Sequence, residues 1–362
     1  MTCFALQRLM RSVDIDLRFE EVPVKPRRRN LLVAITAVAA LMMAAIPARA
    51  TFPGKNGRIA FRQDGEIFTM NPDGSDVKQL THVTPDGSAD WASWSADGKQ
   101  IVFNESLPPD GIPELWLMNA DGSNQRRLLA ERRYSENRPS FSPDGSKVVF
   151  ARCKLFVGDQ DTCAIHTINV DGTGLKAVVP FRLDDTQRNP MFSPDGKTIA
   201  FIISPDAHQG FQGVTYLVDA DGSNLRRITD PEPCFIRPDW SPDGTKLVAF
   251  THFCNPQPSE IAVVNPDGTG LQSLTHNGKD YDTGFHDRNP AFSPDGNFIV
   301  FERNAPDFSS SAIFLIRVDG SGLKEIAVLP ATKRAPQKFG PRGRLKQIEE
   351  GGLRPRWGVA PQ

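Results

Sequence analysis

At 362 residues the chain is long for one ordinary domain but of normal length for a closed all-β array of repeats, so its length does not require a second domain. The formal net charge of −1 conceals an uneven distribution, because residues 51–330 carry 26 basic and 37 acidic side chains. An acidic body of this kind repels phosphate backbones, and we therefore expect no nucleic acid partner.

Residues 1–50 have the features of an export signal with a long basic leader. A basic run at residues 25–30 precedes an apolar run at residues 31–46, and PARA at residues 47–50 places alanine at the −3 and −1 positions that suit signal peptidase. Sixteen apolar residues are few for a transmembrane helix, which favours cleavage after Ala50 over an uncleaved anchor. We expect a periplasmic or secreted protein. The signal is compatible with both the general and the twin-arginine export route.

From residue 51 onward one sequence unit recurs. The segment FSPDGSKVVF at residues 141–150 returns as FSPDGKTIAF, WSPDGTKLVAF and FSPDGNFIVF. The aromatic residues that align ahead of this turn are spaced 42 to 52 residues apart and are Phe52, Trp94, Phe141, Phe192, Trp240 and Phe292. A period of this length is typical of the blades of a β-propeller.

Each unit contains four short β-rich runs: one before SPDG, one after it, one that ends in a second DG turn, and one that closes the unit. Pro-Asp-Gly and Ala-Asp-Gly are turn sequences, because glycine adopts positive φ freely and aspartate can close an Asx-turn. The repeats in residues 51–330 therefore predict an all-β fold: a six-bladed β-propeller with four strands per blade.

The first unit lacks its innermost run, and the far end of the chain supplies a match. LRPRWG at residues 353–358 resembles IRPDWS at residues 236–241, so residues 353–362 are predicted to form a C-terminal strand that completes the first blade. Such closure removes an exposed sheet edge. Residues 331–352 are then a basic connecting segment.

Four cysteines remain once the signal is removed, and they form two local pairs. Cys153 and Cys163 flank one predicted hairpin, and Cys234 and Cys254 flank another, so each pair can face across antiparallel strands. Metal sites more often use CxxC spacing or adjacent histidines. We expect two disulfides in an oxidising compartment, and neither a metal nor a cofactor.

The repeats, with the pattern P-x-[WF]-S-P-D-G-x-x-[IV]-x-F, resemble the WD40-like PD40 repeats of the TolB-type β-propeller. The resemblance covers residues 52–358, although the first unit, FPGKNGRIAF, is eroded. It implies a six-bladed propeller with a binding role in the cell envelope, where the propeller docks envelope proteins. It concerns the propeller alone, because no TolB-like α/β domain is predicted ahead of it. We expect a monomer that binds an envelope or secreted protein or peptide, with at most peripheral membrane contact.

Five units carry an arginine just ahead of the innermost run, and the second unit carries Asp90 there. These arginines are Arg138, Arg188, Arg237, Arg288 and Arg354. If the innermost strands line the central channel, five guanidinium groups gather at one mouth and could bind carboxylates, a peptide C-terminus or another anion through forked hydrogen bonds. In the alternative interpretation, each arginine pairs with an aspartate of an SPDG turn and joins neighbouring blades.

Three loops interrupt the repeat, at residues 107–114, 204–213 and 276–287. Loops on a rigid scaffold commonly carry recognition. The residues predicted to make contacts there are His208, Phe211, Tyr281, Phe285 and His286.

The remaining motifs have structural explanations. The segment at residues 219–230 resembles a calcium loop, but Asn224 and Leu225 stand where that template places a glycine and a carbonyl ligand, so we expect no calcium there. The chain has no G-x-S-x-G, H-E-x-x-H or Walker motif. We expect a binding or scaffold module. The alternative is an extracytoplasmic hydrolase or lyase that acts on saccharide or peptide at the channel mouth.

Overall fold

The computed structural model describes residues 52–129, 131, 133–155, 162–181, 186–204, 213–230, 233–252, 258–278, 280–329 and 353–361. These residues lie in one compact unit, Pro47–Gln362. The predicted signal at residues 1–50, the connecting segment at residues 331–352, and His208, Phe211 and Cys254 lie outside the described residues.

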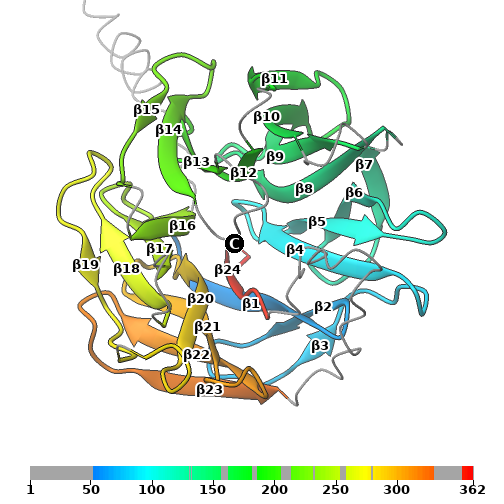
Figure 1. Cartoon of the computed structure of the whole chain (residues 1–362). Coiled ribbons are helices and arrows are strands. Elements are labelled where there is room, and N and C mark those ends of the chain that lie inside the picture. The colour runs from blue at the N-terminus through cyan, green and yellow to red at the C-terminus, as the bar shows by residue number, and fades with distance from the viewer. Residues whose placement is uncertain are drawn as a thin grey trace, which may run out of the picture. The chain divides into compact units, whose positions relative to one another are not determined.

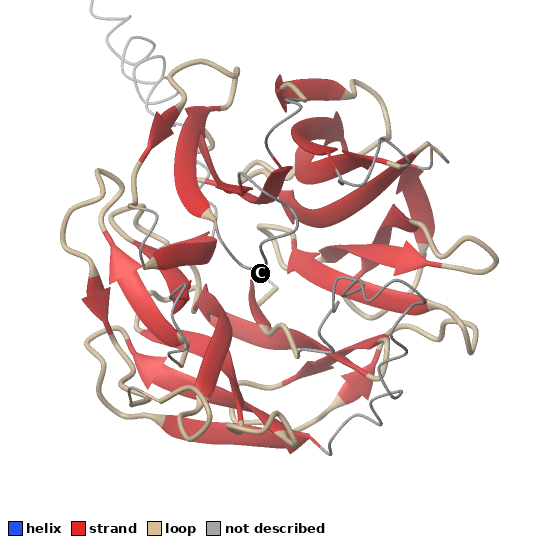
Figure 2. Cartoon of the chain, viewed as in Figure 1, coloured by secondary structure: helices blue, strands red, loops and turns tan. Residues whose placement is uncertain are grey.

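Six four-stranded antiparallel sheets are arranged around a central axis (Figures 1 and 2). The strands of the first three blades, from the axis outward, are β24 (Arg356–Val359), β1 (Asn56–Gln63), β2 (Glu66–Met70) and β3 (Lys78–Gln79); β4 (Ser88–Trp94), β5 (Gln100–Ser106), β6 (Pro113–Asn119) and β7 (Arg126–Leu129); β8 (Tyr134–Phe141), β9 (Lys147–Lys154), β10 (Thr162–Asn169) and β11 (Lys176–Val179). Those of the last three are β12 (Thr186–Phe192), β13 (Thr198–Ser204), β14 (Val214–Asp219) and β15 (Arg226–Arg227); β16 (Cys234–Trp240), β17 (Leu247–His252), β18 (Glu260–Val264) and β19 (Gln272–Ser273); β20 (His286–Phe292), β21 (Phe298–Asn304), β22 (Ser311–Arg317) and β23 (Lys324–Leu329).

This arrangement confirms the predicted all-β, six-bladed propeller and its closure by the C-terminal strand, since β24 is the innermost strand of the first blade. Within the part of the chain that the structure describes, no helix has the length and hydrophobicity of a membrane span.

The SPDG motif forms the turn between the first and second strands of a blade. In the third blade Gly145 donates its N–H to the carbonyl of Ser142 at 2.9 Å. Asp144 accepts hydrogen bonds from the hydroxyl of Ser142 at 2.5 Å and from the N–H of Ser146 at 3.0 Å. Gly145 has a φ of 69°, which glycine adopts without strain. The motif therefore recurs because it shapes the turn.

Neighbouring blades are held together by apolar side chains. One phenylalanine of each second strand is almost wholly buried, and these residues are Phe61, Phe103, Phe150, Phe201, Phe250 and Phe301. The buried clusters extend across blade boundaries, as where Phe250 of the fifth blade and Phe301 of the sixth belong to one cluster. Burial of this apolar area is the main term that stabilises the ring.

The second DG turn of each blade packs against the blade before it. Gly222 has a φ of 99°, and a Cβ placed there would lie 2.7 Å from the carbonyl oxygen of Val178 in the preceding blade. The same relation recurs at Gly122, where the Cβ would lie 2.8 Å from the carbonyl oxygen of Leu80. Glycine is therefore required both by the backbone conformation and by the close approach of the blades.

Closure joins two segments that are 300 residues apart in sequence. Trp357 of β24 faces Ile59 of β1, and the Trp357 indole donates to the carbonyl of Gly57 at 3.1 Å. Arg62 donates its N–H to the carbonyl of Leu353 at 2.7 Å. The C-terminal strand thus covers an edge that β1 would otherwise expose.

Trp357→Ala should open this closure. A buried tryptophan truncated to alanine costs about 3–5 kcal/mol, and here the loss also frees the edge of β1. Trp240→Ala is the matched control, because Trp240 occupies the equivalent place in the fifth blade, whose chain is continuous. We expect faster amide hydrogen exchange at Ile59 and Ala60 in Trp357→Ala than in Trp240→Ala. Equal exchange rates in the two variants would show that β24 does not hold the ring shut.

Candidate functional site

Each blade has one residue in a left-handed backbone conformation at its innermost strand; it lies within that strand in five blades and two residues ahead of β24 in the first. In five blades the pairing with the second strand shifts register at this point, which marks a β-bulge. The six residues have φ between 44° and 59° and line one cavity on the axis. They are called here the axial ring: Arg354, Trp91, Arg138, Asn189, Arg237 and Asn289, in blade order. Non-glycine residues rarely adopt this conformation, so the bulge aims these side chains.

The axial ring contains three of the five predicted arginines: Arg138, Arg237 and Arg354. Arg188 and Arg288 stand one position earlier, beside Asn189 and Asn289, and are not among the described residues that line the axial cavity. The guanidinium of Arg288 lies over the ring of Phe308, 5.1 Å from its centroid. The axial arginines precede the aligned aromatic residue of their unit by three positions, whereas Arg188 and Arg288 precede it by four. This difference in spacing would have separated the two sets in the sequence.

Side chains of the axial ring connect alternate pairs of blades. Arg138 of the third blade donates to the amide oxygen of Asn189 in the fourth, and Arg237 of the fifth donates to that of Asn289 in the sixth. Arg354 of the first blade forms an ion pair with Asp90 of the second. Each of these contacts runs from an odd-numbered blade to the next even-numbered one, so the ring has an approximate threefold pattern.

The indole ring of Trp91 has three guanidinium groups around it. The guanidinium carbons of Arg354, Arg138 and Arg237 lie 4.0, 4.6 and 4.9 Å from the centroid of its indole ring. These distances are within the range of cation–π attraction. No two of these guanidinium carbons can be further apart than 9.5 Å, the sum of the two longest distances.

Carboxylates lie behind this ring. Glu302 accepts hydrogen bonds from the amide of Asn289 at 2.8 Å and from the N–H of Leu353 at 3.0 Å. Asp239 lies 3.5 Å from Arg356 and accepts the N–H of Phe292 at 2.9 Å. These acids fix the surrounding strands, whereas the described residues that line the axial cavity include four arginines and neither aspartate nor glutamate.

The alternative in which each arginine pairs with an aspartate of an SPDG turn stays a prediction. Asp195 and Asp243 accept hydrogen bonds from the serines of their own turns, at 2.6 Å each, as Asp144 does. The described contacts of the axial arginines include two asparagines and Asp90.

The loop residues predicted to carry recognition divide into two kinds. His286 is fully buried, hydrogen-bonds the carbonyl of Tyr281 through its ring Nε2 at 3.2 Å, and stacks on Phe308 with centroids 4.6 Å apart. Tyr281 packs on the same imidazole at 4.3 Å. Phe285 is 47% exposed, and with Leu323 it lines a cavity of about 470 Å³ between the fifth and sixth blades. Among the predicted loop residues that the structure describes, Phe285 is the exposed large apolar side chain.

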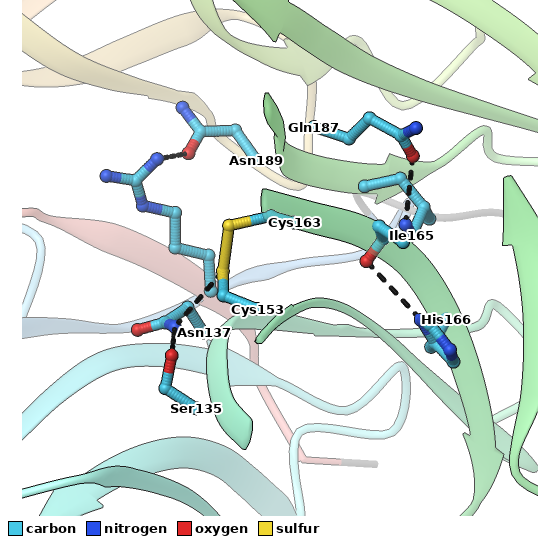
Figure 3. Close-up of a disulfide and its surroundings, with 10 residues drawn as sticks. Ser135, Asn137, Cys153, Cys163, Ile165, His166, Gln187 and Asn189 are labelled. Carbon is cyan, nitrogen blue, oxygen red and sulfur yellow. Dashed lines mark hydrogen bonds between the residues drawn. A yellow bond between two sulfur atoms is a disulfide. The ribbon is translucent and has the colours of Figure 1, made fainter. Parts of the chain in front are cut away.

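The predicted disulfide between Cys153 and Cys163 is present and joins directly opposed residues of β9 and β10 (Figure 3). The amide of Asn137, which precedes Arg138 in β8, lies 3.8 Å from the Cys153 sulfur. The disulfide thus supports the strand that carries one axial arginine. Cys234 is buried, and its pairing with Cys254 stays a prediction. The described residues contain no group of three or more His, Cys, Asp or Glu side chains placed to hold a metal ion.

We expect replacement of both Cys153 and Cys163 by serine to lower the free energy of unfolding by roughly 3 kcal/mol, because the bridge closes a loop of about ten residues. Urea unfolding under oxidising conditions measures this difference. The variant removes one bridge only, so the predicted pair of Cys234 and Cys254 does not confound it. An unchanged free energy of unfolding would show that the β8–β10 sheet does not depend on the bridge.

A buried carboxyl near the axial ring should make stability depend on pH. Burial raises the pKa of Glu136 to about 8, with Arg152 at 3.5 Å opposing the shift. The folded state then holds a proton that the unfolded state releases near its ordinary pKa of 4.5, so stability falls as pH rises between these values. The slope approaches about 1.4 kcal/mol per pH unit. Glu136→Gln should flatten it in urea unfolding at pH 5 to 8; an equal slope in the variant would assign it to other groups.

Comparison with known proteins identifies relatives for the propeller. A family model described as the TolB beta propeller domain matches residues 111–338. An uncharacterised protein of Agrobacterium fabrum is 30% identical over 141 residues, which are 38% of this chain and 46% of that protein. A TolB homolog of Chlorobium luteolum is 27% identical over 165 residues, 45% of this chain and 34% of the homolog. The chain thus matches less than half the length of either relative.

Among solved structures, TolB from Acinetobacter baumannii superimposes with a TM-score of 0.63 at 19% identity, over 86% of this chain and 69% of that one. At this level of identity the likeness concerns the fold.

Proposed function

The chain belongs to the TolB β-propeller family, and from this premise we propose that it is an exported binding module of the cell envelope with a protein or peptide partner. The disulfide between Cys153 and Cys163 supports export, because such bonds persist in oxidising compartments. The signal predicted at residues 1–50 supports the same location.

The observation that carries the proposal is the difference between the two faces of the propeller. In the second to sixth blades the first and third strands run in one direction and end at the SPDG turn (SADG in the second blade) and at the second DG turn, which define the turn face. The remaining connections define the loop face. The three loops that interrupt the repeat follow β5, β13 and β19 and therefore all belong to the loop face. Sequence variation gathered on one face of a rigid scaffold favours recognition there.

Candidate contacts on the loop face are Phe285 and the loop that follows β5, which contains Gly111. Phe285 supplies apolar area, and the guanidinium of Arg303 lies 5.4 Å from its ring centroid. We propose that Arg188 and Arg288, beside the axial ring, contribute positive charge to the same face. An exposed aromatic residue next to arginine is a common composition for the centre of an interface.

Affinity capture from envelope extract tests this proposal, with the full chain expressed, exported and used as bait. Phe285→Ser should abolish capture of a partner that the wild type retains. Leu271→Ser is the matched control, because Leu271 is 46% exposed but lies on the turn face, so it should leave capture unchanged. Loss of capture in the control alone would place the interface on the turn face, and equal capture by all three proteins would contradict a loop-face partner.

A further inference from the structure

We propose that the cavity inside the axial ring is a carboxylate site that holds a single carboxylate group against Arg138, Arg237 and Asn189. The group can come from a small free carboxylate or from the C-terminus of a bound peptide, since both present the same two oxygens. The inference rests on the proposed function only for the second of these sources.

One residue that lines the arginine-lined space has an unused hydrogen-bond donor. Asn189 is 8% exposed, lines the cavity, and accepts a hydrogen bond from Arg138 on its amide oxygen. Its Nδ2 has no hydrogen-bond partner in the described part of the chain. A buried N–H without an acceptor is costly, so an acceptor supplied by a ligand would stabilise this arrangement.

The equivalent asparagine of the sixth blade shows what Asn189 lacks. Asn289 donates its Nδ2 to Glu302, which faces Arg288 across the β20–β21 pair. In the fourth blade the residue that faces Arg188 across β12–β13 is Ile202. The fourth blade thus has an aliphatic side chain where the sixth has a carboxylate, and the Asn189 Nδ2 has no acceptor in the described part of the chain. A ligand carboxylate would take the role that Glu302 has in the sixth blade.

The charge of the lining agrees with a negatively charged ligand. Among the described residues that line the cavity, four are arginines and none is aspartate or glutamate. Arg354 and Arg356 have Asp90 and Asp239 beside them, so the ligand is assigned to the side of the cavity formed by Arg138 and Arg237. Burial and then the neighbouring Arg62 hold the pKa of Arg354 below its ordinary value, which reflects positive charges crowded away from water. A guanidinium presents parallel donors that match the two oxygens of a carboxylate.

The size of the cavity limits the ligand to one such group. Its volume is about 30 Å³. Since one water needs roughly 10–15 Å³ by this measure, the space holds about two oxygen atoms. Two oxygens on one carbon fit this description, whereas a bulky anion does not. The indole of Trp91, beside the same arginines, forms an apolar wall.

Thermal unfolding of the purified protein tests the site, with acetate as the probe and pivalate, which has the same charge but a bulkier body, as the control anion at equal ionic strength. We expect acetate to raise Tm saturably, by about 2–4 °C at concentrations well above its Kd, and pivalate to have no such effect. Equal effects of the two anions, or none, would overturn the proposal.

Two matched variants separate binding from general stability. Asn189→Asp places a carboxylate in the cavity, at a φ that aspartate tolerates, and should raise Tm and abolish the response to acetate. Asn289→Asp puts the same change next to Glu302 and should lower Tm. A lower Tm in Asn189→Asp together with an undiminished acetate response would overturn the assignment of Asn189.

The source of the carboxylate is distinguished with N-acetyl-triglycine and its C-terminal amide. Stabilisation by the free acid but not by its amide supports a peptide C-terminus as ligand. Stabilisation by acetate without an effect of the free acid supports a small anion. Because these measurements use purified protein, they do not depend on the loop-face partner: failure to capture that partner would contradict the proposed function and leave the acetate result intact.

Discussion

The left-handed residue at the innermost strand of each blade, within the strand in five blades and just ahead of β24 in the first, is the constraint on which the centre of this molecule depends. A regular strand would alternate its side chains between the two faces of the blade. The bulge breaks that alternation, so that residues as different as Trp91, Arg138 and Asn189 all face the axis. The positive φ that this requires is unfavourable for a tryptophan or an arginine. It is maintained because the flanking strands are paired on both sides of the bulge and the blades are packed against one another.

Closure of the ring converts this local geometry into a site. Arg354 belongs to the axial ring only because the C-terminal strand returns to the first blade, and Leu353 beside it is held by Glu302 of the sixth blade. The three inter-blade contacts of the ring then bring positive charge together from the first, third and fifth blades. Association of like charges costs free energy in a low dielectric, and the indole of Trp91 and the carboxylates behind the ring offset part of that cost.

The fold was predictable from sequence because its determinants are local and repeated. SPDG and DG turns are set by residues two to four positions apart, and the return of the RPxW pattern at the C-terminus revealed the closure. The candidate site was predicted only in part. Arg188 and Arg288 were grouped with the axial arginines although they precede the aligned aromatic residue by four positions and the axial arginines precede it by three. The bulge turns only the residue at the third position toward the axial cavity, and the repeat pattern alone does not reveal a bulge. The burial of His286 depends on Phe308, from another loop, and the open amide of Asn189 depends on Ile202, so neither followed from the repeat alone.

Anomalous diffraction from crystals of the protein soaked in bromide would most directly show whether the axis holds an anion. Bromide reports small-anion sites and is located independently of any assumption about the ligand. The structure predicts one bromide on the axis, within contact distance of the Asn189 amide and the guanidinium of Arg138 or Arg237, and its absence from crystals of Asn189→Asp. Bromide bound only at surface arginines, with water filling the axial cavity, would contradict an anion site at the centre of the propeller.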